Sequence, residues 1–364
     1  MRQVRFMGVG SFVPSRVISN ERIAAAIPGW SPERIEEKLG IHERRFLWDF
    51  DTERGKAIPP PDLEFYPANN VEMCEVALRG ALKMAQVDGE ALDALFVVTC
   101  TPDRLNFNHD AMALHEKVGC RPDAFGLVLD DGCGGTPYVI DLARKMIEGG
   151  TFRTIAVVAS ALTSPLLNRE VYTDELVPAP GRKPLSALLT MYVFGDGASA
   201  VILRGEEAEG PSGILRSISG NGYAELVLRR AGGGVNLPYQ GGARPAEHAF
   251  VVDGLQVARS YPRYMRHCLE EVTGGDLALL DQVKRFYFHQ PNRRVLDRFA
   301  EEAGLRRERI ACNVERQGNT SAAGMLTLLA EDLERGEVRL GSGALVMIAA
   351  VGANVHYGAQ LVRL

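Results

Sequence analysis

The sequence predicts an α/β protein built from two similar halves. Short, nearly continuous apolar runs alternate with amphipathic helices along the 364 residues, a pattern typical of strands buried on both faces of a sheet. The order of these elements repeats once, around a strand ending at Cys100 and again around a strand ending at His289. Two copies are too few for a solenoid, so the pattern indicates a doubled α/β unit.

The apolar runs and helical periodicities give each element an expected place in the chain. In one of the helices, Val139, Leu142 and Met146 recur at helical spacing, and Gly149 follows as a stop signal. Strands are expected at residues 94–100, 125–129, 154–160, 198–203, 285–289, 344–351 and 359–364, and helices at 71–85, 138–148, 295–303 and 322–335.

The repeat divides the chain into an N-terminal half, residues 1–208, and a C-terminal half, residues 209–364, joined near residues 205–210. A doubled unit of this kind is expected to hold its active site where the halves meet. Residues 46–69 and 163–186 interrupt the pattern with several prolines, so both are expected to be long loops.

Composition excludes several classes of protein. The net charge is −5 and no block of basic residues stands out, so no general attraction to nucleic acid is expected. No apolar run approaches the roughly 20 residues that span a bilayer, and no signal peptide is apparent, so we expect a cytoplasmic protein with no membrane association. The six cysteines form no CxxC pair, which predicts free thiols and no metal site.

Cys133 is the first candidate for chemistry. It lies in Asp131-Gly132-Cys133-Gly134-Gly135, between an expected strand and an expected helix. Flanking glycines permit a sharp turn, and the positive end of the helix dipole would favour the thiolate. The alternative is a small residue in a tight turn, and position alone leaves the two interpretations balanced.

Two polar residues of the second half complete a candidate set. His289 ends a buried strand, where ligands commonly bind in α/β sheets, although a core histidine is the alternative. Asn319 lies in a turn before a helix, where a helix cap is the alternative. The order Cys, His, Asn also occurs in papain-like proteases, but Cys133 lacks the local papain signature and the doubled α/β pattern does not suit that fold.

Five further motifs follow one another along almost the whole chain. They are LGIHERR at residues 39–45, FGDGA at 194–198, HQPN at 289–292, GNTSAA at 318–323 and GAN at 352–354. Together with the opening GVGSFVP at residues 8–14, they resemble the ketoacyl synthase III branch of the thiolase superfamily. The resemblance implies a five-layered αβαβα thiolase fold, a homodimer, and acyl thioester substrates on coenzyme A or acyl carrier protein, with no metal or redox cofactor.

The resemblance also implies roles for the three candidates. Cys133 would accept an acyl group, and His289 and Asn319 would stabilise the oxyanion of a decarboxylating malonyl thioester. Such an enolate needs donors aimed at its oxygen, which a neutral imidazole and a carboxamide provide. The backbone N–H groups of Cys133 and Ala353 would form the oxyanion hole.

More peripheral roles follow from the same resemblance. Asn292 and Arg294 would lie near the pantetheine arm or the carrier protein, and Phe107 would line the pocket across the dimer. Arg34 stands where primary fatty-acid members have a tryptophan that stacks on coenzyme A. His356, close to the GAN motif, is expected to be only a strand residue.

Three functions remain open at this stage. The first is decarboxylative Claisen condensation of an acyl group on Cys133 with a malonyl- or β-ketoacyl-type thioester. The departures from the family pattern place that reaction in specialised, polyketide-type metabolism. The second is acyl transfer to an alcohol or amine without decarboxylation, against which Asn319 argues because relatives of that kind typically have an aspartate there. The third, a non-catalytic partner subunit, would have no need of Cys133, His289 and Asn319.

Overall fold

The computed structural model describes residues 2–60, 66–104, 107–172, 190, 192–207, 210–222, 227–229 and 250–364. The helices within these ranges are α1 Asn20–Ala26, α2 Pro32–Leu39, α3 Asn70–Ala85, α4 His109–Val118, α5 Gly135–Glu148, α7 Gly254–Thr273, α8 Arg293–Glu302, α9 Val314–Gln317 and α10 Gly324–Glu334. The strands are β1 Arg2–Phe12, β2 Val17–Ser19, β3 Glu43–Arg45, β4 Asp49–Asp51, β5 Lys56–Ile58, β6 Ala94–Val98, β7 Phe125–Leu129, β8 Thr154–Ala161, β9 Gly197–Glu207, β10 Gly213–Asn221, β11 Val227–Arg229, β12 Phe250–Val252, β13 Arg285–Phe288, β14 Leu345–Val351 and β15 His356–Arg363.

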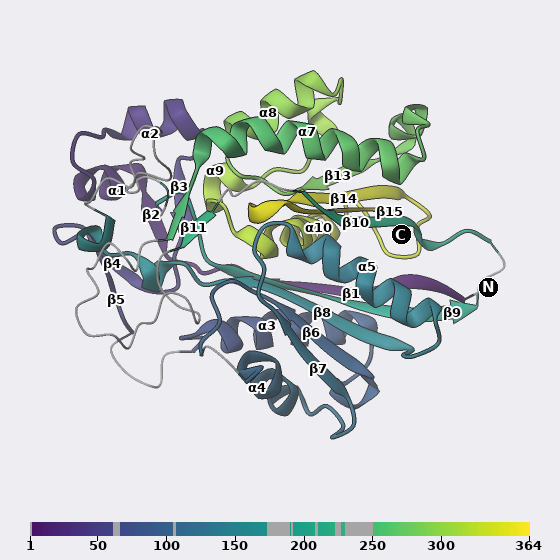
Figure 1. The fold of residues 1–364 in the computed structure, drawn as a ribbon. Coiled ribbons are helices and arrows are strands. Elements are labelled where there is room, and N and C mark those ends of the chain that lie inside the picture. Colours follow the sequence, from purple (N-terminus) through teal and green to yellow (C-terminus); the bar gives the residue numbers. More distant parts are fainter. Residues whose placement is uncertain are drawn as a thin grey trace.

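Helices and sheets alternate in five layers (Figure 1). The two large sheets enclose α5 and α10 between them. Helices α3 and α4 cover the outer face of one sheet, and α7 and α8 cover the outer face of the other. This αβαβα arrangement confirms the fold class that the sequence predicts.

The two large sheets repeat one topology. The first has the order β1-β9-β8-β6-β7 and the second the order β10-β15-β14-β13. In each, parallel strands (β6 with β7 and β8 in the first, β13 with β14 in the second) continue into antiparallel neighbours. Strand β7 has no counterpart among the described residues of the second sheet and forms an edge of the first. The doubled pattern seen in the sequence is therefore a doubled sheet.

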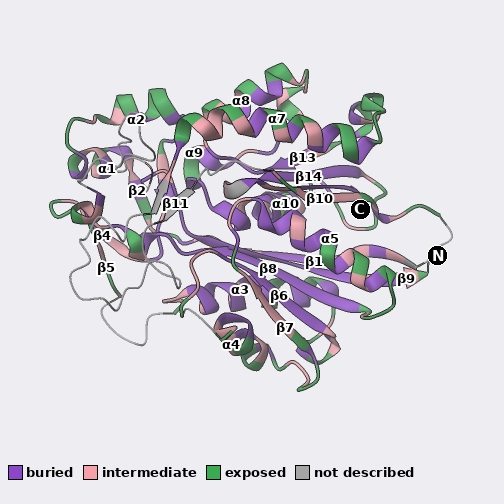
Figure 2. Ribbon diagram, in the orientation of Figure 1, coloured by how far each residue is buried: buried purple, intermediate pink, exposed green. Residues whose placement is uncertain are grey.

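Apolar side chains from both sheets and the two middle helices form the largest core (Figure 2). Every residue of β6, β8 and β14 is buried, which is why these strands read as unbroken apolar runs. Each of these strands has helices on both sides, so neither face meets water. The central strands and helices lie within a few residues of their expected places.

One expectation at the element scale needs correction. Residues 49–58 are not loop, because β4 and β5 pair as a short hairpin within the segment 46–69. The expected junction at residues 205–210 falls partly inside β9, which ends at Glu207, while β10 begins at Gly213. The boundary between residues 208 and 209 lies outside the described residues, as do residues 173–186 of the second expected loop.

Helix α7 was not expected from the sequence. Its 20 residues include Pro262, and an internal proline is a strong signal against a helix. Asp253 offsets part of this cost by accepting hydrogen bonds from the backbone N–H groups of Leu255 and Gln256 at the helix start. The buried side of α7, which includes Tyr261 and Met265, supplies the tertiary contacts that favour the helix.

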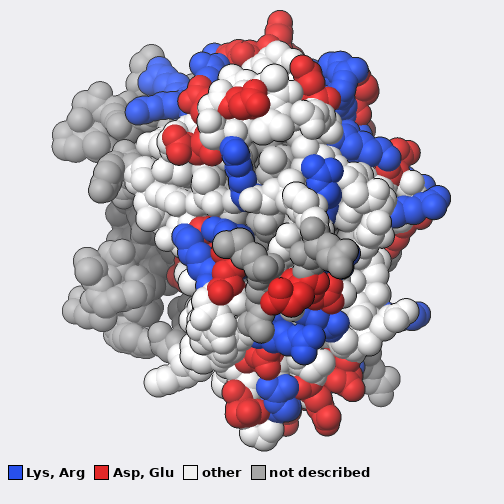
Figure 3. Space-filling view, turned by 90° about the vertical axis from the view of Figure 1, so that its right-hand side faces the viewer, with Lys and Arg blue, Asp and Glu red and all other residues white. Residues whose placement is uncertain are grey.

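The surface carries charges of both signs. On the face in Figure 3, lysines and arginines are interspersed with aspartates and glutamates, so that face presents no uniform basic patch. None of the helices in the described ranges combines the length and apolarity that a membrane crossing requires.

Candidate active site

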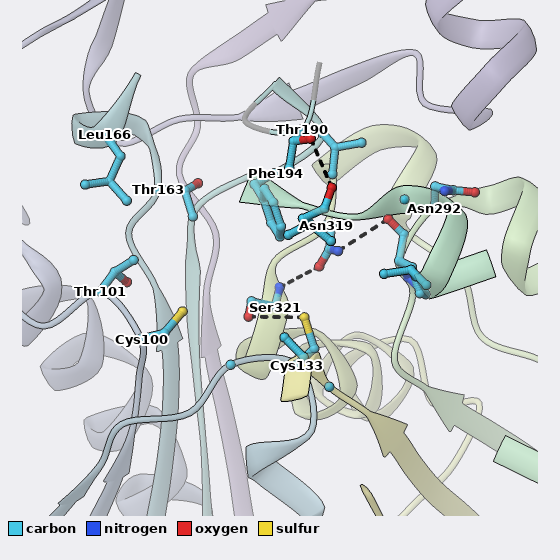
Figure 4. Close-up of a pocket in the computed structure, with 18 of the residues that line it drawn as sticks. Cys100, Thr101, Cys133, Thr163, Leu166, Thr190, Phe194, Asn292, Asn319 and Ser321 are labelled. Atoms are coloured by element: carbon cyan, nitrogen blue, oxygen red, sulfur yellow. Dashed lines mark hydrogen bonds between the residues drawn. The ribbon is translucent and has the colours of Figure 1, made fainter. Parts of the chain in front are cut away.

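A cavity of about 1420 Å³ lies where the two halves meet, and Cys133, His289 and Asn319 all line it. Cys133 lies two residues before the start of α5, His289 directly follows β13, and Asn319 lies between α9 and α10. The structure thus brings together three residues that are far apart in the sequence. Figure 4 shows Cys133, Asn319 and Ser321 grouped at one point of the cavity wall.

The turn at Cys133 depends on close backbone contacts. A Cβ atom on Gly134 would lie 2.3 Å from the carbonyl oxygen of His356, and one on Gly352 would lie 2.3 Å from the nitrogen of Gly134. Glycine at both positions lets the nucleophile turn meet the β14–β15 connection. This contact brings the backbone of Cys133 close to Ala353, the pair expected to form an oxyanion hole.

The Cys133 thiol is protonated in the resting site. Burial raises its pKa to about 11, and the negative charge of Asp131 adds to the effect, while contacts with Ser321 and Asn319 oppose it. Burial therefore opposes the thiolate that the helix N-terminus would favour. Its Sγ atom lies 3.5 Å from Oγ of Ser321.

His289 is buried and neutral. Burial lowers the pKa of its imidazole to about 3, so one ring nitrogen carries a proton and the other does not. The hydroxyl of Tyr261 donates a hydrogen bond of 2.5 Å to the backbone carbonyl oxygen of His289. The backbone N–H of His289 donates a hydrogen bond of 2.9 Å to the carbonyl oxygen of Ala349. These bonds fix the backbone from which the imidazole projects.

Neighbouring Gln290 locks the end of β13 in place. Its amide donates to the carbonyl of Ala311 and accepts from the backbone N–H groups of Asn313 and Val314. The glutamine of the HQPN motif thus holds the strand end to the segment that leads to Asn319, and does so from a buried position.

The orientation of the Asn319 carboxamide is fixed by its neighbours. Its Oδ1 accepts a 2.8 Å hydrogen bond from the backbone N–H of Ser321, which leaves Nδ2 as the group able to donate. Nδ2 donates a long hydrogen bond, 3.3 Å, to the carbonyl oxygen of Pro291, and a hydrogen bond from Asn319 also lowers the pKa of the Cys133 thiol. Asn319 is therefore not a side-chain cap for α10, and its amide donor remains available.

Sequence reasoning missed Ser321. Its hydroxyl lies within hydrogen-bonding distance of the Cys133 thiol, and its backbone N–H orients Asn319. Ser321 has a φ of 49°, a left-handed conformation that is uncommon outside glycine. Its position two residues after Asn319 could have indicated that it lies in the site, but the sequence does not predict its left-handed backbone conformation.

The peripheral candidates have different placements. Asn292 and Arg294 line the cavity, and Oδ1 of Asn292 also caps α8 by accepting from the N–H of Val295 at 2.9 Å. Arg294 donates to the carbonyl oxygens of Glu37 and Glu36 at the end of α2. Ala353 also lines the cavity, whereas Phe107 does not and is 96% exposed.

His356 is more than a strand residue. It begins β15, as expected, but its Nδ1 lies 2.6 Å from Oδ2 of Asp131, and both residues line the cavity. Sequence reasoning missed this contact, because 225 positions separate the two side chains. Within the described residues, no group of three or more His, Cys, Asp or Glu side chains is arranged to hold a metal ion.

Comparison with known proteins places this architecture in a family. Residues 129–221 match the family described as 3-oxoacyl-[acyl-carrier-protein (ACP)] synthase III, and residues 276–364 match the corresponding C-terminal family. The chain belongs to the ketoacyl synthase III branch of the thiolase superfamily. The resemblance inferred from the motifs is confirmed, and the matched segments carry Cys133, His289 and Asn319.

Individual relatives of this ketoacyl synthase III-like chain span its whole length. A beta-ketoacyl-[acyl-carrier-protein] synthase III from Acidiphilium cryptum is 29% identical over 366 residues, covering 100% of both chains. The crystal structure of FabH from Pseudomonas aeruginosa, at 23% identity, shares the fold with a TM-score of 0.78 and covers 100% of this chain and 98% of its own. A priming β-ketosynthase from the R1128 polyketide pathway is 25% identical, with a TM-score of 0.77 over 100% of this chain and 96% of its own.

Proposed function

We propose that this enzyme performs decarboxylative Claisen condensation. An acyl group held on Cys133 would join a malonyl- or β-ketoacyl-type thioester. The observation that carries the proposal is the convergence of one thiol and two neutral donors, His289 and Asn319, on a single cavity. Decarboxylation supplies the carbon nucleophile without a strong base, so neutral donors are the groups that such a reaction requires.

The first half-reaction moves the acyl group onto the enzyme. The Cys133 sulfur forms a bond to the acyl carbon, the bond between that carbon and the carrier's sulfur breaks, and the Cys133 proton leaves with the carrier thiol. Because burial raises the pKa of Cys133 to about 11, this proton must be lost as the substrate binds. The N–H groups of Cys133 and Ala353 would stabilise the oxyanion at this step.

The second half-reaction forms the carbon–carbon bond. Carbon dioxide leaves the malonyl thioester, and the electron pair passes to the α-carbon as an enolate. A neutral imidazole at His289, whose pKa lies at about 3, and Nδ2 of Asn319 would donate to the enolate oxygen. The α-carbon then attacks the acyl carbon and displaces the Cys133 sulfur as a thiolate, which takes up a proton from solvent. None of the steps uses a metal or redox cofactor.

The carrier we favour is an acyl carrier protein. The relatives' names include this partner. Arg34, which stands where primary fatty-acid members have a tryptophan, stacks its guanidinium 4.4 Å above the ring of the nearby Trp30 and donates to the carbonyl oxygen of Gly29. Arg34 therefore already covers one face of the Trp30 indole. This arrangement offers a coenzyme A adenine a less open surface at the position of Arg34.

A role in specialised, polyketide-type metabolism is part of the proposal. It is supported by the similarity to the R1128 priming β-ketosynthase and by the thinned Gly352-Ala353-Asn354 loop. The relatives named beta-ketoacyl-[acyl-carrier-protein] synthase III leave a role in primary fatty-acid synthesis as the alternative. The starter accepted by Cys133 would separate the two, since a branched, aromatic or otherwise unusual acyl group favours specialised metabolism.

We further propose that two copies join along β7. This strand is an edge of its sheet, and an unpaired edge offers N–H and C=O groups to another chain. Phe125 at the start of β7 is 48% exposed, and Phe107 is almost fully exposed. A second copy would cover both rings and allow Phe107 to reach the partner's cavity.

The test uses a malonyl thioester labelled in its free carboxylate. The proposal predicts labelled carbon dioxide and a 3-oxoacyl thioester only when the enzyme has first been acylated, and neither product from Cys133→Ala. Release of carbon dioxide without any 3-oxoacyl product, or product from the Cys133→Ala variant, would contradict it.

A further inference from the structure

The Asp131–His356 pair lies beside the nucleophile and has no part in the condensation described above. Nδ1 of His356 and Oδ2 of Asp131 are 2.6 Å apart, and the other carboxylate oxygen accepts a 2.7 Å hydrogen bond from the N–H of Gly132. Asp131 is almost completely buried, whereas about a third of the His356 side chain is accessible. The buried carboxylate therefore holds a reachable imidazole in one orientation.

This orientation is that of a proton acceptor. A carboxylate on Nδ1 places the ring proton on that nitrogen and leaves Nε2 as the basic atom. Within the described part of the chain, Nε2 of His356 has no hydrogen-bonding partner, and the residue lines the cavity. Asp131 raises the pKa of the His356 imidazole above its ordinary value, which strengthens it as a base.

The pair is built into the walls that carry the reacting groups. Asp131 lies two residues before Cys133, and the carbonyl oxygen of His356 accepts a 2.8 Å hydrogen bond from Gly352, next to Ala353. The negative charge of Asp131 also raises the pKa of the Cys133 thiol. His356 and Cys133 line the same cavity, and the backbone of His356 packs closely against Gly134, the residue that follows Cys133.

The step that forms the carbon–carbon bond needs no base, because decarboxylation supplies the carbon nucleophile, and the proton of Cys133 leaves with the carrier thiol. A second kind of nucleophile therefore explains the pair better. We propose that Asp131 and His356 form a second proton-transfer site, which activates a hydroxyl or amino group of an acceptor molecule for attack on the acyl group of Cys133. The inference rests on the proposed function to the extent that it requires an acyl group on Cys133.

The proposed step balances without a co-reactant. Nε2 of His356 takes the proton from the acceptor as its oxygen or nitrogen bonds to the acyl carbon. The bond from that carbon to the Cys133 sulfur breaks, and the sulfur takes the proton back from His356. The products are an ester or amide and the free enzyme. A hydroxyl or amine suits an imidazole base, because its proton becomes acidic as the oxygen or nitrogen bonds to the acyl carbon.

The experiment starts from acyl-enzyme freed of excess thioester. Its discharge is followed by intact-protein mass spectrometry after addition of 2-aminoethanol, which carries both acceptor groups, and separately after addition of malonyl thioester. In His356→Ala, discharge by 2-aminoethanol should fall about 100-fold relative to discharge by malonyl thioester, the size expected for loss of one general base. Added imidazole should restore about a tenth of the lost rate.

Two further variants separate a catalytic role from a structural one. His356→Gln keeps a donor for Asp131 but cannot take a proton, so it should resemble His356→Ala. His267→Ala is the matched control, because His267 is also half-buried and contacts Tyr357, the next residue of β15, at 3.3 Å. That control should discharge at the wild-type ratio.

Three results would overturn the inference. They are wild-type acyl-enzyme that 2-aminoethanol does not discharge, a His356→Gln variant with the wild-type ratio, and a lack of rescue by imidazole. A wild-type enzyme that takes up no acyl group on Cys133 would instead overturn the proposed function, and this inference with it.

Discussion

At the scale of single residues, the protonation states of Cys133 and His289 and the orientation of Asn319 define the site. Burial keeps both Cys133 and His289 neutral, with pKa values of about 11 and about 3. Asn319 is oriented by the backbone of Ser321, so its donor faces away from that bond. A neutral thiol beside two neutral donors is suited to stabilising negative charge that appears only during reaction.

Asn319→Asp tests the donor role of the carboxamide. A carboxylate oxygen would replace the Nδ2 donor and repel the enolate, so decarboxylation should fall about 100-fold or more while acylation falls less than about 10-fold. Acylation is measured by intact mass and decarboxylation by release of carbon dioxide. Equal losses in both steps would contradict the role given to Asn319.

His289 should also make stability depend on pH. Its pKa is about 3 in the folded protein and ordinarily 6.5, so between these values the unfolded chain binds a proton that the folded protein does not. The free energy of unfolding should therefore fall as the pH falls from 6.5 towards 3, by about 1 kcal/mol per pH unit. Above pH 6.5 this residue should contribute no slope.

Urea denaturation at several pH values measures this effect. His289→Gln is the comparison, because it fills similar space without a titratable ring. The wild type should lose more stability than the variant between pH 6.5 and pH 4.5. Parallel profiles for the two proteins would contradict the assignment of His289 as a buried neutral imidazole.

At the scale of elements, Asp196 organises both segments expected to be long loops. Its buried carboxylate accepts hydrogen bonds from the backbone N–H groups of Leu47, Thr163 and Ser164 at 2.7 to 2.9 Å, and from the Thr163 hydroxyl at 3.0 Å. The FGDGA motif thus ties the starts of segments 46–69 and 163–186 to β9. Both segments contribute residues to the cavity wall.

Asp196→Asn should therefore loosen one side of the cavity. The amide would turn an N–H group toward existing donors, so we expect a loss of about 2–3 kcal/mol in the free energy of unfolding. Asp123→Asn is the control, since Asp123 is exposed and its pairing with Arg121 is a surface contact. Denaturant titration gives both values, and equal small losses would contradict the role of Asp196.

The central elements could be predicted because their causes are local. Residues 94–98 and 345–351 are apolar throughout, since helices cover both faces of their sheets. Helix α7 was not predicted, because Pro262 is a local signal against a helix, whereas the tertiary contacts that favour the helix come from distant segments. The hairpin of β4 and β5 escaped for a related reason, because three-residue strands leave little periodicity to detect.

The site divides in the same way. Cys133, His289 and Asn319 could be found because turns and strand ends mark them, and the motif order supplied their roles. Ser321 and the Asp131–His356 pair could not, because one depends on an unusual φ and the other on a contact across 225 positions. The protonation state of Cys133 could not be predicted either. The helix that follows Cys133 can be recognised locally, but the desolvation of the thiol depends on the whole fold.

At the scale of the whole molecule, the doubled sheet creates the cavity. Each half contributes the end of a parallel strand and the start of a helix, and the site lies between them. The nucleophile comes from the first half, and the two donors come from the second. A shift of one half against the other would therefore alter the distance between the thiol and its donors.

The assembled protein should be a dimer of 39.7 kDa chains. Phe107→Asp should weaken it, because Phe107 is 96% exposed in one subunit and its left-handed φ of 56° suits aspartate. Light scattering should show two copies for the wild type and a shift toward one copy for the variant. Leu277→Asp, another exposed apolar position, is the control, and a monomeric wild type would refute the prediction.

The most direct test of the central claim is intact-protein mass spectrometry after incubation with a panel of acyl thioesters. The wild type and Cys100→Ala, which removes the other cysteine of the cavity wall, should gain one acyl group, and Cys133→Ala should gain none. Adding malonyl thioester should then remove the adduct with release of carbon dioxide. An adduct on another cysteine in Cys133→Ala, or one that malonyl thioester leaves in place, would contradict the account.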